Sequence, residues 1–98
     1  MTEIELSGED VLLIRNALNE TLHGLEPGEI DPTLSARWTE AEYLFTVLTP
    51  TSNALPSASR EVAIMALRNV AAAIDDPELS TRIGFSRDEL DGLVERLS

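Results

Sequence analysis

The stretch DDPELSTRIGFSRDELDGLVERL, residues 75–97, holds the clearest helix signals in this 98-residue chain. Asp76 followed by a proline is a typical helix start, because Asp caps a helix and Pro fits its first position. Gly84 is suited to end that short helix in the left-handed conformation. Ser86 and Glu89 have the spacing of a capping box, which opens a final helix. The core face of this final helix is expected to hold Leu90, Leu93, Val94 and Leu97.

The beginning of that stretch has an earlier counterpart. DPTLSAR, residues 31–37, and DPELSTR, residues 76–82, are identical at five of seven positions. A long amphipathic pattern precedes each copy, and a capping-box signal follows each. We interpret this as an internal duplication that divides the chain into pseudo-repeat halves, residues 1–50 and 51–98. Chance recurrence of short helix-start signals is the alternative.

The first half begins with a strong helix pattern. Ser7 followed by Asp10 resembles an N-cap with an acid in the first turn. The apolar stripe repeats at spacings of three and four and contains Val11, Ile14, Leu18, Leu22 and Leu25, with Leu12 and Leu13 beside it. Later in this half, Thr39 and Glu42 have the spacing of another capping box. Either a short helix over 32–38 breaks at Thr39 and restarts, or one longer helix runs through it.

The second half begins with a linker, because residues 49–57 combine two prolines with Ser, Thr and Asn. A third long helix is predicted over residues 58–74, with Ala63, Leu67, Val70 and Ile74 on one face. Residues 2–6 alternate between polar and apolar and are interpreted as an extended lead-in, with an edge strand as the alternative. The sequence predicts one all-α domain, residues 1–98, built as a compact bundle of four main helices plus one or two short helices.

Charge and composition limit the possible partners. Eighteen acidic residues face seven arginines and no lysine, for a net charge of −11, and residues 1–50 alone carry −8. Such a field repels nucleic acid and anionic membranes and attracts cationic partners. The acidity either keeps the protein soluble or forms an interaction face on the N-terminal half. The absence of cysteine excludes disulfides and thiolate metal sites, and without a signal pattern or spanning segment we expect a cytoplasmic protein.

The sequence shows no catalytic or metal-binding arrangement. His23 shares i, i+3 spacing with Glu20 and Glu26, but a histidine near a helix C-terminus is more typical of capping than of metal binding. The neighbouring carboxylates are expected in helix first turns, where acids suit the helix dipole. These neighbours are Glu40 and Glu42, Asp75 and Asp76, and Asp88, Glu89 and Asp91. We therefore expect no enzyme, no metal and no cofactor.

The arginines of the repeated unit are expected to tie helices together. Arg37 and Arg82 each follow an apolar leucine by three positions, and Glu20 is a candidate partner for an ion pair. Direct contact with a binding partner is the alternative. Trp38 and Tyr43 are expected in the core, although either one could anchor a partner if it were exposed.

Two segments together resemble a known group of proteins. ALNETLHGLE, residues 17–26, and ELSTRIGFSRDELDGLVERL, residues 78–97, are similar to small acidic bacterial proteins with an ALNE…G helix followed by an E[FL]xTRxGxSRxE segment. In this chain about fifty residues separate the two pieces. Some members of the group look like immunity proteins, encoded beside polymorphic secreted toxins. The resemblance implies a small helical module with Glu20 and Arg82 as motif residues, and it supplies no catalytic residue.

The function that we expect is a small acidic protein-binding inhibitor of immunity type. Its acidic surface would engage a basic partner, such as a secreted bacterial toxin with a phosphate-binding cleft. The residues expected to carry this contact are Glu20, Glu26, Glu29 and Asp31. The alternative is a non-catalytic structural or regulatory module, which self-associates through the Ala-rich third helix or serves as an accessory subunit.

Overall fold

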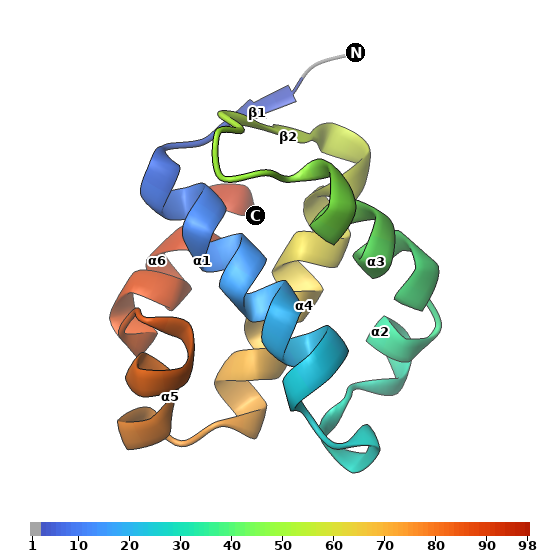
Figure 1. Cartoon of the computed structure of the whole chain (residues 1–98), viewed down its shortest axis with the longest axis vertical. Coiled ribbons are helices and arrows are strands. Elements are labelled where there is room, and N and C mark those ends of the chain that lie inside the picture. Colours follow the sequence, from blue (N-terminus) through green and yellow to red (C-terminus); the bar gives the residue numbers. More distant parts are fainter. Residues whose placement is uncertain (1–2) are drawn as a thin grey trace.

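The protein, described by a computed structural model over residues 3–98, is mostly helical (Figure 1). The α-helices within these residues are α1 Gly8–Asn19, α2 Pro32–Ser35, α3 Trp38–Val47, α4 Arg60–Ala73, α5 Asp76–Ile83 and α6 Arg87–Leu97. Shorter turns are a π-helix, η1 Glu20–Gly24, and the 3₁₀-helices η2 Pro27–Glu29 and η3 Ser57–Ser59. The predicted helical class is confirmed in broad terms, and a small sheet is added to it.

Helix α4 is the centre of the molecule. It packs against α1, α3 and α6, and Figure 1 shows α1 crossing in front of it, with α2 and α3 on one side and α5 and α6 on the other. Its inward residues are buried, namely Val62, Ala63, Ala66, Leu67 and Val70. Small alanine side chains allow neighbouring helices to approach closely. Ala63 and Ala66 of this Ala-rich helix are covered within the core, while Ala72 is exposed.

Residues 3–5 are extended as expected, but they form the edge strand that was the alternative and not an unpaired lead-in. Strand β1, Glu3–Glu5, pairs antiparallel with β2, Ala54–Pro56, and Ile4 lies opposite Leu55. The backbone N–H of Leu6 continues the ladder with a 2.9 Å hydrogen bond to the carbonyl of Asn53. The partner strand lies in the segment predicted as a linker, where Leu55 is fully buried. Residue 2, also part of this prediction, lies outside the described residues.

The two similar heptapeptides both begin α-helices, which differ in length and in their N-caps. Asp31 caps α2, and its Oδ1 accepts a 2.7 Å hydrogen bond from the N–H of Thr33. Helix α5 is twice as long, and its N-cap is Asp75, so the prediction that Asp76 caps was wrong by one residue. Gly84 ends α5 with a φ of 79°, in the left-handed conformation that was expected. The proposed equivalence of the two halves remains a prediction.

The break between α2 and α3 comes earlier than Thr39. The N–H of Ala41 donates to the carbonyl of Arg37, so the new helix is already established there. Arg37 is the N-cap residue and makes no side-chain capping bond, and Thr39 lies inside the first turn. The capping box predicted at Thr39 and Glu42 is therefore absent from α3. The capping box predicted for the last helix forms at Ser86 with Glu89, and Ser7, predicted only as an N-cap of the first helix, also forms a box with Asp10.

None of the helices over residues 3–98 combines the length and the apolar character that a membrane crossing would require.

Candidate protein-binding site

The site begins where α1 widens into the π-helix η1. The N–H of Leu25 donates to the carbonyl of Glu20 over 2.8 Å, which is the five-residue step of a π-helix. This wider turn ends α1 and starts the acidic stretch that follows. Thr21 lies inside it, 1% exposed, and its Oγ1 has no hydrogen-bond partner among the described residues. Single π-turns inside helices often occur at functional sites, because they re-aim the side chains around them.

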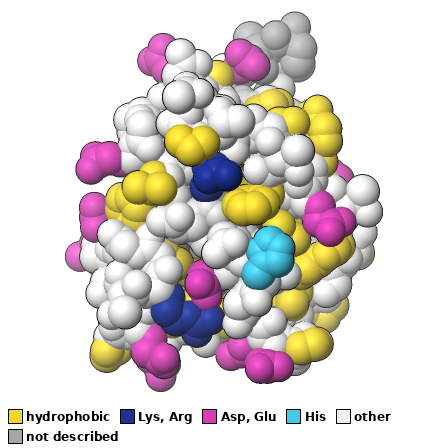
Figure 2. Space-filling view, viewed as in Figure 1, with side chains coloured by type: hydrophobic (Ala, Val, Ile, Leu, Met, Phe, Trp, Pro, Cys, Tyr) yellow, Lys and Arg dark blue, Asp and Glu magenta, His cyan; other side chains and the backbone are white. Residues whose placement is uncertain are grey.

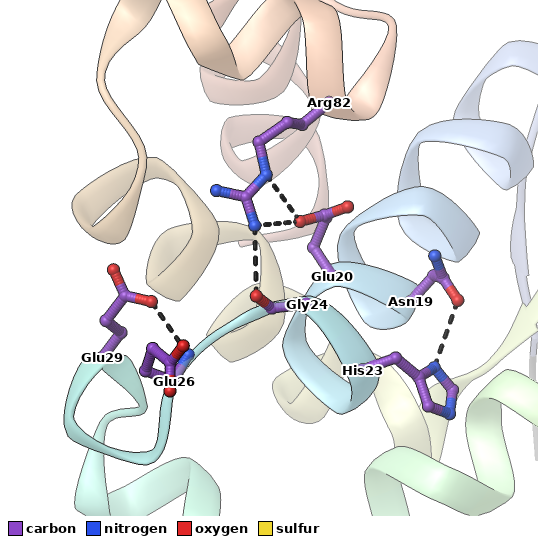
Figure 3. Close-up of polar contacts among 7 residues, drawn as sticks. All are labelled: Asn19, Glu20, His23, Gly24, Glu26, Glu29 and Arg82. Atoms are coloured by element: carbon purple, nitrogen blue, oxygen red, sulfur yellow. Dashed lines mark hydrogen bonds and ion pairs between the residues drawn. The ribbon is translucent and has the colours of Figure 1, made fainter.

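Glu20 of this turn forms an ion pair with Arg82 of α5 (Figure 3). Both Nε and Nη2 of Arg82 donate to Oε1 of Glu20, over 2.9 Å and 2.5 Å. Nη2 also donates to the carbonyl of Gly24 over 3.3 Å. The Glu20 side chain is only 15% exposed. The pair thus ties the end of α1 to α5, and the Glu20 carboxylate is engaged within the protein.

The close approach of this ion pair explains the glycine at position 24. A Cβ atom built on Gly24 would lie 2.6 Å from Oε1 of Glu20 and 3.3 Å from Nη2 of Arg82. Real Cβ atoms essentially never come so close to another heavy atom. Glycine is therefore the residue that lets the carboxylate lie over the backbone here.

The three other acids predicted to bind a partner are exposed on the acidic loop, residues 25–31. The N–H of Glu26 donates to Oε1 of Glu29 over 2.9 Å, which closes a capping box on η2 (Figure 3). Asp31 caps α2 at the end of the same loop. The structure thus brings Glu26, Glu29 and Asp31 together on one loop and assigns Glu20 to an internal contact.

Asn69 of α4 holds the acidic loop in place. Its Oδ1 accepts a 2.6 Å hydrogen bond from the N–H of Asp31, and its Nδ2 donates over 3.0 Å to the carbonyl of Glu29. Asn69 is 6% exposed, and both ends of its amide are satisfied by the loop backbone. The sequence prediction missed this residue. The available signal was a polar side chain next to Val70 on the core face of an apolar helix, since buried amides require partners.

A hollow of about 420 Å³ lies beside the acidic loop, between α2 and α4. Its lining combines apolar and charged side chains, with Leu34, Met65 and Ala72 next to Asp31 and Arg68. Arg68 is exposed and takes part in no ion pair within residues 3–98. A partner at the loop would therefore also meet an apolar depression with one arginine at its side.

Arg37 lies apart from Glu20. Its Nε and Nη2 donate to the two carboxylate oxygens of Glu40, and its Nη1 donates to Glu61 over 2.7 Å. The hydrogen bond from Arg37 holds the pKa of the Glu40 carboxyl below its ordinary value. Of the two arginines in the repeated unit, Arg82 meets Glu20, while Arg37 joins α3 to the start of α4.

The remaining residues singled out by the sequence lie on the surface around α3. His23 is exposed, with Nδ1 3.1 Å from Oδ1 of Asn19, and its ring meets the ring of Phe45 edge-on. Within residues 3–98, no cluster of three or more metal-ligating side chains forms. The expectation of a core position was wrong for Tyr43, which is 61% exposed because it lies on the outer side of α3, and Trp38 is only half-buried.

Comparison with known protein families, curated proteins and solved structures found no match for this chain.

Proposed function

We propose that this protein is a small acidic inhibitor of immunity type, which blocks a basic protein partner such as a secreted bacterial toxin. The observation that carries the proposal is the acidic loop, which presents Glu26, Glu29 and Asp31 in a fixed conformation. A loop that is already ordered loses little conformational entropy when it binds, so its charges contribute more fully to affinity. The resemblance of the two motif segments to immunity-like proteins points in the same direction.

The charge of the chain supports fast association with a basic partner. Residues 1–50 carry −8 of the net −11, and the acidic loop lies within them. Complementary charge raises the rate of encounter, and this effect weakens as salt screens it. We propose that the loop enters a basic cleft that normally receives phosphate, and that the protein itself is not catalytic.

The contact between Glu20 and Arg82 has a supporting role in this proposal. It joins the two sequence segments that resemble the immunity-like group, and it fixes the end of α1 from which the acidic loop departs. Glu20 is therefore assigned to positioning the loop, while Glu26, Glu29 and Asp31 are assigned to the partner.

The test begins with capture and identification of the partner by the tagged protein in its native host. Association and dissociation rates are then measured at several salt concentrations with the purified partner. Glu26→Gln, Glu29→Gln and Asp31→Asn remove charge but keep the oxygen acceptors that the loop and the α2 cap use. We expect the combined variant to associate at least tenfold more slowly at low salt and to lose most of its salt dependence.

The matched control is Glu95→Gln, because Glu95 is an exposed acid on α6, away from the acidic loop. It should change the association rate only slightly. Equal slowing by Glu95→Gln and by a single loop variant would show that overall charge, and not the loop, attracts the partner. An acidic or uncharged partner surface would overturn the proposal.

We also propose, as the sequence suggests, that the chain arose from two related halves. The order of elements supports this, because α1, α2 and α3 in the first half are followed by α4, α5 and α6 in the second. In each half a long helix precedes a short helix that begins with an Asp-Pro pair.

A further inference from the structure

The negative charge of this protein is too widely spread to select one partner. Figure 2 shows acidic side chains over the visible face of the molecule and around its edge. Charges arranged in this way speed the approach of any basic protein, but they do not distinguish one basic surface from another. A partner is distinguished by groups that reject the wrong surface as well as by groups that attract the right one. Among acids, such rejection requires a cation.

Arg68 of α4 places a positive charge beside the acidic loop. Among the described residues, two charged side chains line the hollow between α2 and α4, those of Asp31 and Arg68, and no ion pair joins them. Four of the seven arginines form ion pairs within residues 3–98, and the exposed Arg68 is not among them. A lysine or arginine of a partner would meet a like charge at Arg68, whereas a carboxylate would be attracted there.

The hollow between these two charges has an apolar lining. Leu34 is fully buried beneath it, and the half-buried Met65 and the exposed Ala72 belong to its α4 side. Its volume of about 420 Å³ falls within the range of pockets that receive ligand groups. Asn69 fixes the side next to the loop through its hydrogen bonds to the loop backbone, and methionine adapts its shape to what packs against it. The hollow is therefore suited to an apolar side chain.

We propose that this hollow selects the partner by taking an apolar side chain presented between a basic residue, which meets Asp31, and an acidic residue, which meets Arg68. The Oδ1 atom of Asp31 accepts a hydrogen bond from the N–H of Thr33, whereas Oδ2 has no donor within residues 3–98. This inference rests on the proposed function and names the partner's side chains that follow the first attraction to the loop. Arg68 rejects a uniformly basic segment, and the hollow receives the kind of apolar anchor that typically dominates binding energy.

Arg68→Glu separates this inference from the effect of overall charge. The substitution makes a chain of net charge −11 more negative, so general attraction predicts tighter binding of the captured basic partner. The inference predicts the opposite, an affinity at least tenfold lower through faster dissociation, because the partner's acid would meet a glutamate. Arg60→Glu is the matched control, since Arg60 is an exposed residue of α4 that lies outside the lining and forms no ion pair within residues 3–98. It should leave the affinity unchanged or slightly higher.

Synthetic peptides give the same test without the native partner. A stapled helical peptide carries one leucine, with a lysine one turn before it and a glutamate one turn after it, and a matched peptide has lysine at both places. Anisotropy of the labelled peptides gives their affinities, and amide chemical shifts of the isotope-labelled protein show where they bind. We expect shifts on α2 and α4. Arg68→Glu should change the ratio of the two affinities at least tenfold in favour of the lysine-only peptide, whereas Arg60→Glu should change it less than about twofold.

Ala72→Leu tests the apolar part of the site. A leucine at this exposed position would fill part of the hollow, so it should weaken both the partner and the mixed peptide at least tenfold. Ala58→Leu, at an exposed alanine of η3 outside the lining, should leave both affinities unchanged. Urea unfolding of each variant separates a lost contact from a lost fold.

The outcomes for the hollow and for the loop differ. Peptide shifts confined to elements other than α2 and α4 would overturn the inference, as would equal effects of Arg68→Glu and Arg60→Glu. A captured partner that needs the loop charges but binds Arg68→Glu as tightly as the wild type leaves the proposed function standing and refutes the selective hollow. A partner that is lost with Arg68→Glu but tolerates neutralisation of Glu26 and Glu29 supports the hollow and refutes attraction by the loop.

Discussion

Arg82 and Glu20 lie 62 positions apart in the sequence and form a doubly hydrogen-bonded ion pair at the end of α1. The carbonyl of Gly24 accepts a third hydrogen bond from the same guanidinium. One side chain of α5 therefore holds both the start and the end of the π-helix η1. The direction in which the acidic loop leaves the helix depends on this contact.

Gly24→Ala is expected to disrupt that contact. The new methyl group would overlap the Glu20 carboxylate, which must move and weaken its bonds to Arg82. Because the pair is partly exposed, we expect a loss of about 1 kcal/mol in the free energy of unfolding, measured by urea denaturation. Combining the change with Glu20→Ala should cost less than the sum of the two, since the carboxylate is already gone.

Gly92→Ala is the control for this measurement. Gly92 lies inside α6, and a Cβ atom there would meet no heavy atom within 4 Å. Alanine in a helix interior is favoured over glycine by about 0.5–1 kcal/mol, so this variant should be more stable than the wild type. Equal destabilisation by both glycine substitutions would contradict the account of Gly24.

Acid should weaken the contact between Asp10 and Arg96. Both carboxylate oxygens of Asp10 accept hydrogen bonds from Arg96, which lowers the pKa of Asp10 below its ordinary value. A lowered folded-state pKa stabilises the protein above the unfolded-state value of about 3.9, and this contribution is lost as the pH falls further. The stability advantage of the wild type over Asp10→Asn should therefore shrink below about pH 4, as measured by urea denaturation across pH.

The acid titration has its own control in Glu95→Gln. Glu95 is exposed and makes no ion pair within residues 3–98, so this variant should keep the same acid-dependent loss as the wild type. A difference between the wild type and Asp10→Asn that stays constant from pH 7 to pH 2 would show that the ion pair contributes nothing to folding.

Ser86→Ala should lower stability more than Thr39→Ala. Ser86 Oγ accepts a 3.2 Å hydrogen bond from the N–H of Glu89 and caps α6, so its removal is expected to cost about 1 kcal/mol. Thr39 lies within the first turn of α3 and caps nothing, and alanine has the higher helix propensity. Thermal unfolding of the two variants side by side tests this, and a larger loss in Thr39→Ala would mean that α3 begins at Thr39.

Thr21→Val should stabilise the protein. The Thr21 hydroxyl is buried without a hydrogen-bond partner among the described residues, and valine has nearly the same shape without the polar atom. Removing an unsatisfied buried hydroxyl is expected to add about 1 kcal/mol to the free energy of unfolding. Thr81→Val on α5 is the comparison, since the Thr81 hydroxyl donates to the carbonyl of Pro77, and its removal should give no such gain.

Local signals in the sequence were sufficient for most of the helices. The serine of each capping box acts through the N–H three residues later, so Ser7 and Ser86 could be recognised from spacing alone. Gly84 was also recognisable from local sequence, because glycine adopts the left-handed conformation that ends a helix without help from distant residues. Thr39 shows the limit of this approach. The N–H of Arg37 donates to the carbonyl of Leu34, and the N–H of Ala41 donates to the carbonyl of Arg37. Helix α3 therefore begins before Thr39 and does not use it as its N-cap.

Contacts between distant segments could not be predicted in this way. Ile4 pairs with Leu55 across two strands of three residues each. Neither strand is long enough to be recognised from its own sequence, because the pairing depends on the core that both strands cover. The hold of Asn69 on the acidic loop depends on how α4 lies against residues 25–31. Arg82, and not Arg37, pairs with Glu20 because α5 packs beside the end of α1. The sequence does not contain this information locally. The acids of the loop were visible in the sequence, but their fixed arrangement was not.

The bond between Asp10 and Arg96 spans 86 positions, and the core face of α6 closes over α4. During synthesis, α1 through α5 would emerge from the ribosome with α4 still uncovered on that side. The core can close only after α6 has emerged, so we expect the chain to reach its native state after translation of this segment is complete. A ribosome stalled before α6 should therefore hold a nascent chain that proteases cut readily.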